Sequence, residues 1–86
     1  MAISVVRAIC VTIVYRLDGE FKTFRGRIDS PLLMDRFFRL EVGETNGLFV
    51  PVGKGQQVSS SNVEWFEIIR VTDGCDCPDQ YKDYLS

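Results

Sequence analysis

The sequence predicts an all-β fold, a small five-stranded, strongly bent antiparallel barrel with little helix. Runs of β-branched and aromatic residues recur along the chain, and many of them alternate apolar and polar side chains as half-buried strands do. Turn signals separate these runs at short intervals. The runs carry more apolar side chains than one face of a flat sheet can hide, which favours a sheet that curls up or pairs with another chain.

The size and charge of the chain indicate one domain with an acidic tail. With 86 residues and 45% hydrophobic residues, the chain is suited to a single core. The net charge is −2, and much of the acidity lies at the end, where Asp73, Asp76, Asp79 and Asp83 accompany Lys82. We expect residues 1–72 to form the barrel domain and residues 73–86 to form a tail that is mobile or lightly docked.

The first half of the chain predicts a hairpin. Residues 5–17 are rich in β-branched side chains and predict a long strand that is apolar on both faces. Asp18-Gly19 is a strong hairpin signal, because the turn requires positive φ angles that Gly adopts at little cost. The next strand is expected over 20–28, with Gly26 marking a bulge or bend.

The second half predicts three more strands. Pro31 ends the second strand, and residues 31–37 fit either a helical turn or a loop. Residues 38–42 alternate as a strand, 44–47 read as a turn, and 48–52 form a strand in which Pro51 implies an edge or a sharp bend. Residues 53–62 are expected to be the most mobile loop, and 62–71 form the last strand.

The order of these pieces resembles the Sm-like family of small barrels, which belongs to the wider group of Src-homology-3-like folds. The matching pieces are Asp18-Gly19, residues 24–30 (FRGRIDS), residues 38–42, and residues 62–68 (NVEWFEI). The resemblance implies a bent five-stranded barrel and ring-forming oligomers. RNA-binding members carry an Asp-x-aromatic-x-Asn motif after the second strand. Here Asp35 is followed by no Asn, so RNA binding is not implied.

Surplus aromatic residues are the main sequence indication of a binding surface. Trp65 and Phe66 are adjacent on one predicted strand and must point to opposite faces, so one of them needs cover from the tail, a second subunit or a partner. Phe37 and Phe38 form a second pair of adjacent aromatic residues with the same requirement. We therefore predict a non-catalytic module for protein–protein interaction or homo-oligomerisation, with Trp65, Phe66 and Phe37 as the partner-binding residues. An accessory regulatory protein, of cellular or phage origin, is one setting for such a module.

A basic stripe supports an alternative function, nucleic-acid binding. Arg25 and Arg27 share one face of the predicted second strand, Arg16 lies across the hairpin, and Arg39 lies on the next strand. Guanidinium groups bind phosphates in a bidentate manner. The competing interpretation is a solvated sheet face, on which basic residues discourage aggregation.

The cysteines and the lack of histidine bear on metals, catalysis and location. Cys75 and Cys77 are weak metal candidates, because a closed zinc site needs four ligands. Without histidine the usual general base is missing, so we expect neither an enzyme nor a cofactor. Three cysteines, Cys10 included, are an odd number for a disulfide scaffold, and no apolar run is long enough to cross a membrane. We therefore expect a cytoplasmic protein, since a reducing cytosol is the simpler setting for these cysteines.

Overall fold

The computed structural model describes residues 5–72 and 83–85. This part of the chain contains strands, one α-helix and one 3-10 helix. In chain order the elements are β1 (Ala8–Leu17), β2 (Glu20–Ile28), α1 (Pro31–Glu41), β3 (Phe49–Gly53), β4 (Gln56–Ser59), η1 (Ser60–Asn62), β5 (Val63–Val71) and β6 (Asp83–Leu85).

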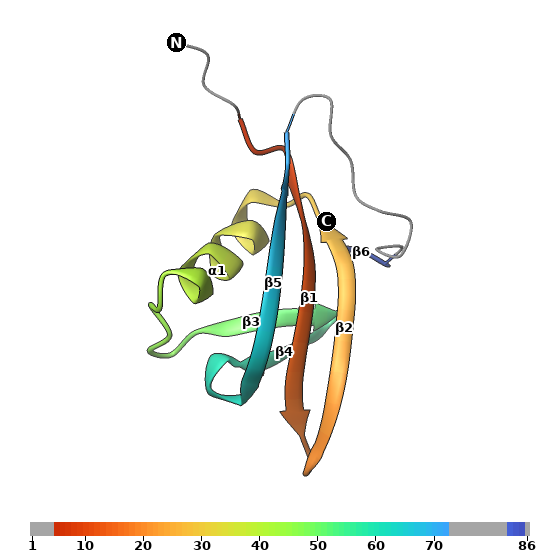
Figure 1. Ribbon diagram of the computed structural model, residues 1–86, viewed down its shortest axis with the longest axis vertical. Helices are drawn as coiled ribbons and strands as arrows, with labels where there is room; N and C mark the ends of the chain where they lie inside the picture. Colours follow the sequence, from red (N-terminus) through yellow and green to blue (C-terminus); the bar gives the residue numbers. More distant parts are fainter. Residues whose placement is uncertain (1–4, 73–82, 86) are drawn as a thin grey trace.

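The strands form two open sheets. The larger sheet has the order β5-β1-β2-β6, in which β1 pairs antiparallel with both β2 and β5, and β6 pairs parallel with β2. The smaller sheet is the β3-β4 ribbon. Helix α1 and this ribbon lie on one face of the larger sheet, here called the inner face (Figure 1). A sheet-rich fold is confirmed, but the described residues form no closed barrel. Helix α1 and the β3-β4 ribbon cover the inner face of the sheet, where a barrel would have further strands of the same sheet.

The β1-β2 hairpin confirms the prediction from the sequence. Asp18 has φ 53° and Gly19 has φ 77°, which are the positive angles that a two-residue hairpin turn requires. The ladder continues from Leu17 opposite Glu20 to Ile9 opposite Ile28 without a register shift. The bulge expected at Gly26 is therefore absent, and the irregularity in the larger sheet lies between Val14 and Tyr15 of β1, where β1 pairs with β5.

Helix α1 replaces the strand expected over 38–42. Pro31 occupies the first turn, where its missing N–H is no loss, and Met34, Phe37 and Leu40 are buried at helical spacing. The helix ends in a Schellman motif, in which the Gly43 N–H donates to the Leu40 carbonyl and the Glu44 N–H donates to the Arg39 carbonyl. The strand prediction was wrong because the alternation of apolar residues over 38–42 is shorter than the helical pattern that contains it.

The polar segment 53–62 is also more ordered than predicted. Residues Gln56–Ser59 form β4, which pairs with β3 from Phe49 opposite Ser59 to Gly53 opposite Gln56. Gly55, with φ 70°, supports the turn between the two strands, and Ser60–Asn62 form η1. Within residues 5–72 there are five strands, but they are not the five predicted, because one expected strand is helical and one expected loop is a strand.

The core fills the space between the inner face, α1 and the β3-β4 ribbon. Its members are mostly aliphatic, with two phenylalanines and one tyrosine among them; they are Ile9, Val11, Ile13, Tyr15, Phe24, Ile28, Met34, Phe37, Leu40, Leu48, Val50, Val52 and Val58. The opposite, outer face of the sheet holds a second, smaller cluster made of Ala8, Cys10 and Val71. Apolar side chains on both faces of β1 were correctly expected from its sequence.

Cys10 on the outer face is disulfide-bonded. An odd number of cysteines leaves room for one bridge. Cys75 and Cys77, the other two cysteines of the chain, lie outside the described residues. Most of the expected tail, 73–86, also lies outside them, and its described part, β6, pairs with Gly26–Ile28 of β2.

Candidate protein-binding site

Strand β5 forms one edge of the larger sheet. Among the described residues β5 pairs with β1 alone, whereas the edge of β2 at the other side is partly covered by β6. Sheet edges are commonly protected by proline, by lysine or by short strands. β5 has nine residues and contains neither proline nor lysine. Among the described residues no strand pairs with its outward side, although Glu64, Glu67 and Arg70 give this edge some of the charge that protects sheet edges.

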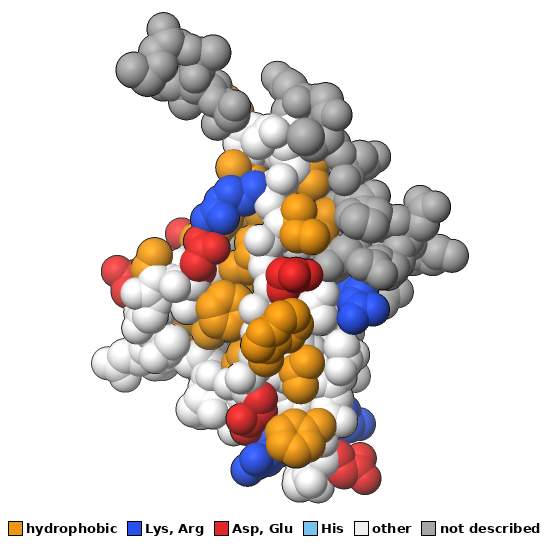
Figure 2. All heavy atoms as spheres, in the orientation of Figure 1, with side chains coloured by type: hydrophobic (Ala, Val, Ile, Leu, Met, Phe, Trp, Pro, Cys, Tyr) orange, Lys and Arg blue, Asp and Glu red, His pale blue; other side chains and the backbone are white. Residues whose placement is uncertain are grey.

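Trp65 lies on the outer face of β5 and is 53% exposed. Its neighbour across the ladder is Val14, which is half-buried, and Ile69 lies further along the same face of β5. Phe21 on β2 is also exposed on this face, with the Arg16 guanidinium 5.1 Å from its ring centre. Figure 2 shows hydrophobic side chains along this face, interrupted by acidic and basic ones. Apolar surface of this kind is typical of binding sites.

Phe66 points to the inner face, where it is half-buried and packs against the core. It also lines a hollow of about 330 Å³ beside β5, here called the edge groove. The lining comes from the end of α1, the loop that follows it, η1 and the start of β5; it consists of Leu40, Thr45, Ser60, Val63, Glu64, Trp65 and Phe66. The lining of the groove combines four apolar residues with the polar residues Thr45, Ser60 and Glu64.

Backbone contacts hold the far wall of the edge groove in place. The Ser60 hydroxyl donates to the Thr45 carbonyl at 2.8 Å, and the Ser60 N–H donates to the Leu48 carbonyl at 2.9 Å. These bonds tie η1 to the loop after α1. Because Ser60 is buried, the bonds are shielded from water and the groove is formed before any partner binds.

A charged contact joins α1 to β5 next to the groove. Arg70 of β5 donates two hydrogen bonds to the Glu41 carboxylate at the end of α1, and its guanidinium lies 5.1 Å from the ring centre of Phe38. The hydrogen bonds to Glu41 raise the pKa of Arg70 above its usual value. The contact joins the end of α1 to β5 beside the edge groove.

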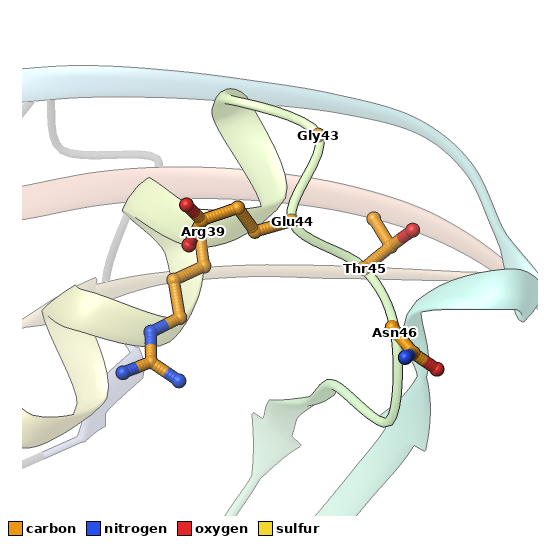
Figure 3. A pocket seen from close by; sticks show the side chains of 5 residues that line it. All are labelled: Arg39, Gly43, Glu44, Thr45 and Asn46. Carbon is orange, nitrogen blue, oxygen red and sulfur yellow. The ribbon is translucent and has the colours of Figure 1, made fainter.

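A second hollow lies on the other side of the loop after α1. It measures about 410 Å³ and is lined by Arg39, Gly43, Glu44, Thr45 and Asn46. Figure 3 shows the Glu44 side chain reaching back over the helix, while the Arg39 guanidinium points away from the loop. Arg39 is held by Asp35 at 3.0 Å, one turn earlier on α1. This hollow is open to solvent, and the described residues that line it do not indicate a particular ligand.

The three aromatic residues predicted to bind a partner do not lie together. Trp65 and Phe66 do lie on opposite faces of one strand, as the sequence requires. Phe37 is fully buried on α1 in the core. It stabilises the fold from the inside and is not accessible to a partner, so it is not part of the candidate binding surface. Its helical spacing with Met34 and Leu40 was the sequence signal for this role.

The four arginines predicted as a basic stripe are divided between two layers. Arg16, Arg25 and Arg27 share the outer face of the hairpin, but Arg39 lies on α1. Arg16 lies 3.4 Å from Glu64, and Arg27 lies 3.0 Å from Asp29. Arg25 donates to the Thr12 hydroxyl at 3.3 Å. Much of the basic charge is thus neutralised by neighbouring carboxylates, and no continuous stripe forms.

The metal candidates Cys75 and Cys77 lie outside the described residues. Within 5–72 and 83–85 no three Cys, Asp or Glu side chains gather in a way that suits a metal ion. Nor does this part of the chain contain a helix of the length and apolarity needed to cross a membrane. Cys10 is disulfide-bonded, and the expected cytoplasmic location stays a prediction.

The edge groove has no signal in the sequence, because its wall comes from α1 and η1, which were predicted as strand and loop. The adjacent aromatics of β5 were the available signal for the site. Comparison of the chain with protein-family models, with curated proteins and with solved structures finds no match.

Proposed function

We propose that this protein is a non-catalytic module that binds a protein partner, or a second copy of itself, through β5. One observation carries the proposal: two adjacent aromatic residues on an edge strand both reach accessible surface, Trp65 on the outer face and Phe66 in the edge groove. Aromatic residues are enriched at interfaces, where a few of them supply most of the binding energy. The open edge beside them supplies backbone groups for pairing.

Site-specific photo-crosslinking tests this proposal. A benzophenone amino acid is placed at Trp65 in one variant and at Leu32 in the control, because Leu32 is 81% exposed and belongs to α1, not to β5. We expect cross-links at position 65, either to one protein or between copies, and none at position 32. Equal cross-linking at both positions, or none at either, would contradict the proposal.

The cross-linked protein is then purified and its affinity is measured directly. We expect Trp65→Thr to weaken binding by about tenfold or more, since loss of a central aromatic contact costs at least about 1.4 kcal/mol. Leu32→Thr serves as the matched control and should bind like the wild type. Sedimentation velocity over a wide concentration series distinguishes a second copy from a different partner.

A further inference from the structure

A third hollow lies between the end of the β1-β2 hairpin and the β3-β4 ribbon. It measures about 440 Å³ and is here called the hairpin hollow. The hairpin extends past the ribbon (Figure 1), so the hollow is open on that side. It shares no lining residue with the edge groove; its lining consists of Tyr15, Leu17, Lys22, Val52, Gly55, Gln56, Gln57 and Val58. Its volume lies within the range of small-molecule sites, about 300–1,000 Å³.

The Tyr15 hydroxyl is an unpartnered polar group in this hollow. Only 5% of Tyr15 is exposed, and its side chain belongs to the core. Among the described residues its hydroxyl makes no hydrogen bond, and no fully buried side-chain oxygen or nitrogen lacks a partner. The hydroxyl must therefore reach accessible space, and the hairpin hollow is the accessible space that Tyr15 lines. A phenol hydroxyl in this position can donate a hydrogen bond to a ligand.

Lys22 places a positive charge beside this hydroxyl. It lies directly opposite Tyr15 in the β1-β2 ladder, so both side chains point to the inner face. Within the described part of the chain Lys22 forms no ion pair; the charged contacts there are made by arginines. Side chains in direct opposition start about 4.5–5.5 Å apart at Cβ, so the ammonium group and the hydroxyl can contact one anionic group together.

The rest of the lining suits an apolar body. Val52 and Val58 of the ribbon are each 5% exposed, and Leu17 of the hairpin is 38% exposed. These three side chains give the hollow apolar surface next to the two polar groups. The ribbon wall is held to α1 from behind, because Arg36 donates to the Gln57 side-chain oxygen at 3.1 Å. The wall is thus in place before a ligand binds.

The polar groups favour a carboxylate over a phosphate. Two donors, the Lys22 ammonium and the Tyr15 hydroxyl, match the two oxygens of a carboxylate. Phosphate has more oxygens and is typically bound by arginine in a bidentate manner, and no arginine lines the hollow. Glu20, two residues before Lys22 on the same face of β2, adds a negative charge near the opening. Its repulsion disfavours a ligand with two negative charges.

We propose that the hairpin hollow binds a small monocarboxylate with an apolar body, of the class of medium-chain fatty acids. The carboxylate accepts hydrogen bonds from Lys22 and Tyr15, and the hydrocarbon part lies against Leu17, Val52 and Val58. This site is separate from β5 and does not depend on the proposed function.

An NMR titration of the full chain with octanoate and with octanamide tests the proposal. We expect octanoate to shift the amide signals of residues 15–22 and 52–58, with a Kd of about 1 mM or tighter for a ligand of this size. Octanamide has the same apolar body without the charge and should bind about tenfold more weakly. The absence of shifts with octanoate at several times that concentration, or equal affinity for the amide, would overturn the proposal.

Tyr15→Phe tests the hydroxyl without disturbing the core. The ring remains, and the hydroxyl has no partner among the described residues, so urea unfolding should give the wild-type stability. Octanoate binding should weaken about threefold or more, because one hydrogen bond is lost. A clear loss of stability would show that the hydroxyl is bonded within the protein, and unchanged octanoate binding would show that it does not contact the ligand; either result overturns the proposal.

Lys22→Met tests the ammonium group. This variant should bind octanoate about tenfold more weakly and octanamide as the wild type does. Lys54→Met is the matched control, because it makes the same change in charge in the turn of the ribbon, at a residue that does not line the hollow. Equal losses of octanoate affinity in the two variants would be general electrostatics, and the proposal would fail.

A peptide terminus carries the same chemical group as a free acid. An acetylated tetrapeptide that ends in leucine, with a free carboxylate, is therefore titrated alongside octanoate. Tighter binding of the tetrapeptide would assign the hollow to the end of a partner chain and would reject a small acid. Because none of these measurements involves Trp65 or β5, their failure would leave the proposed function standing.

Discussion

A pair of aromatic substitutions separates the core of this protein from its proposed binding surface. Phe37 is fully buried, and replacing a buried phenylalanine with alanine typically costs about 3–5 kcal/mol, because apolar contacts are lost and a cavity remains. Trp65 is 53% exposed. Since full burial of a large apolar side chain is worth about 1.5–3 kcal/mol, Trp65→Thr should cost roughly 1 kcal/mol. Threonine also suits a strand, which keeps this cost small.

Urea unfolding followed by far-UV circular dichroism measures both free energies of unfolding. Fluorescence is unsuitable here, because Trp65 is the only tryptophan and one variant removes it. A domain of this size has about 5–10 kcal/mol of stability, so Phe37→Ala should remove a large part of it. Equal costs for the two variants would refute the packing of α1 against the sheet. A cost above about 3 kcal/mol for Trp65→Thr would assign Trp65 to a covered site in the free protein.

Three further predictions concern the exposed indole, the disulfide and the basic face. Acrylamide should quench Trp65 fluorescence in proportion to the exposed fraction of the side chain, and a bound partner should reduce that quenching. An indole that acrylamide does not quench in dilute protein would contradict the exposed position of Trp65. Reduction should lower the free energy of unfolding by about 2–4 kcal/mol, the usual contribution of a disulfide, whereas Cys10→Ala should show no response to reductant in the same urea titration. In filter binding at low salt we expect no retention of single-stranded RNA, because Arg16 and Arg27 have carboxylate neighbours. Salt-sensitive retention that is lost in the double variant Arg25→Ala/Arg27→Ala would support the nucleic-acid hypothesis instead.

Local signals in the sequence determined the hairpin and the strand surfaces. Asp18-Gly19 predicts its turn because the required φ angles depend on those two residues alone. Alternation along 62–71 likewise predicts that Trp65 and Phe66 lie on opposite faces, since successive side chains of any strand do so. The apolar character of both faces of β1 could also be read from the sequence, because burial follows side-chain type.

Only the tertiary structure decided how these pieces are covered. The sequence of 31–42 suits both a helix and a strand, and packing of Met34, Phe37 and Leu40 against the sheet selects the helix. That choice places Phe37 in the core, moves Arg39 away from the other arginines and leaves the sheet open, with a groove beside β5. Each outcome depends on contacts between residues far apart in the chain, and such contacts have no signature in local periodicity.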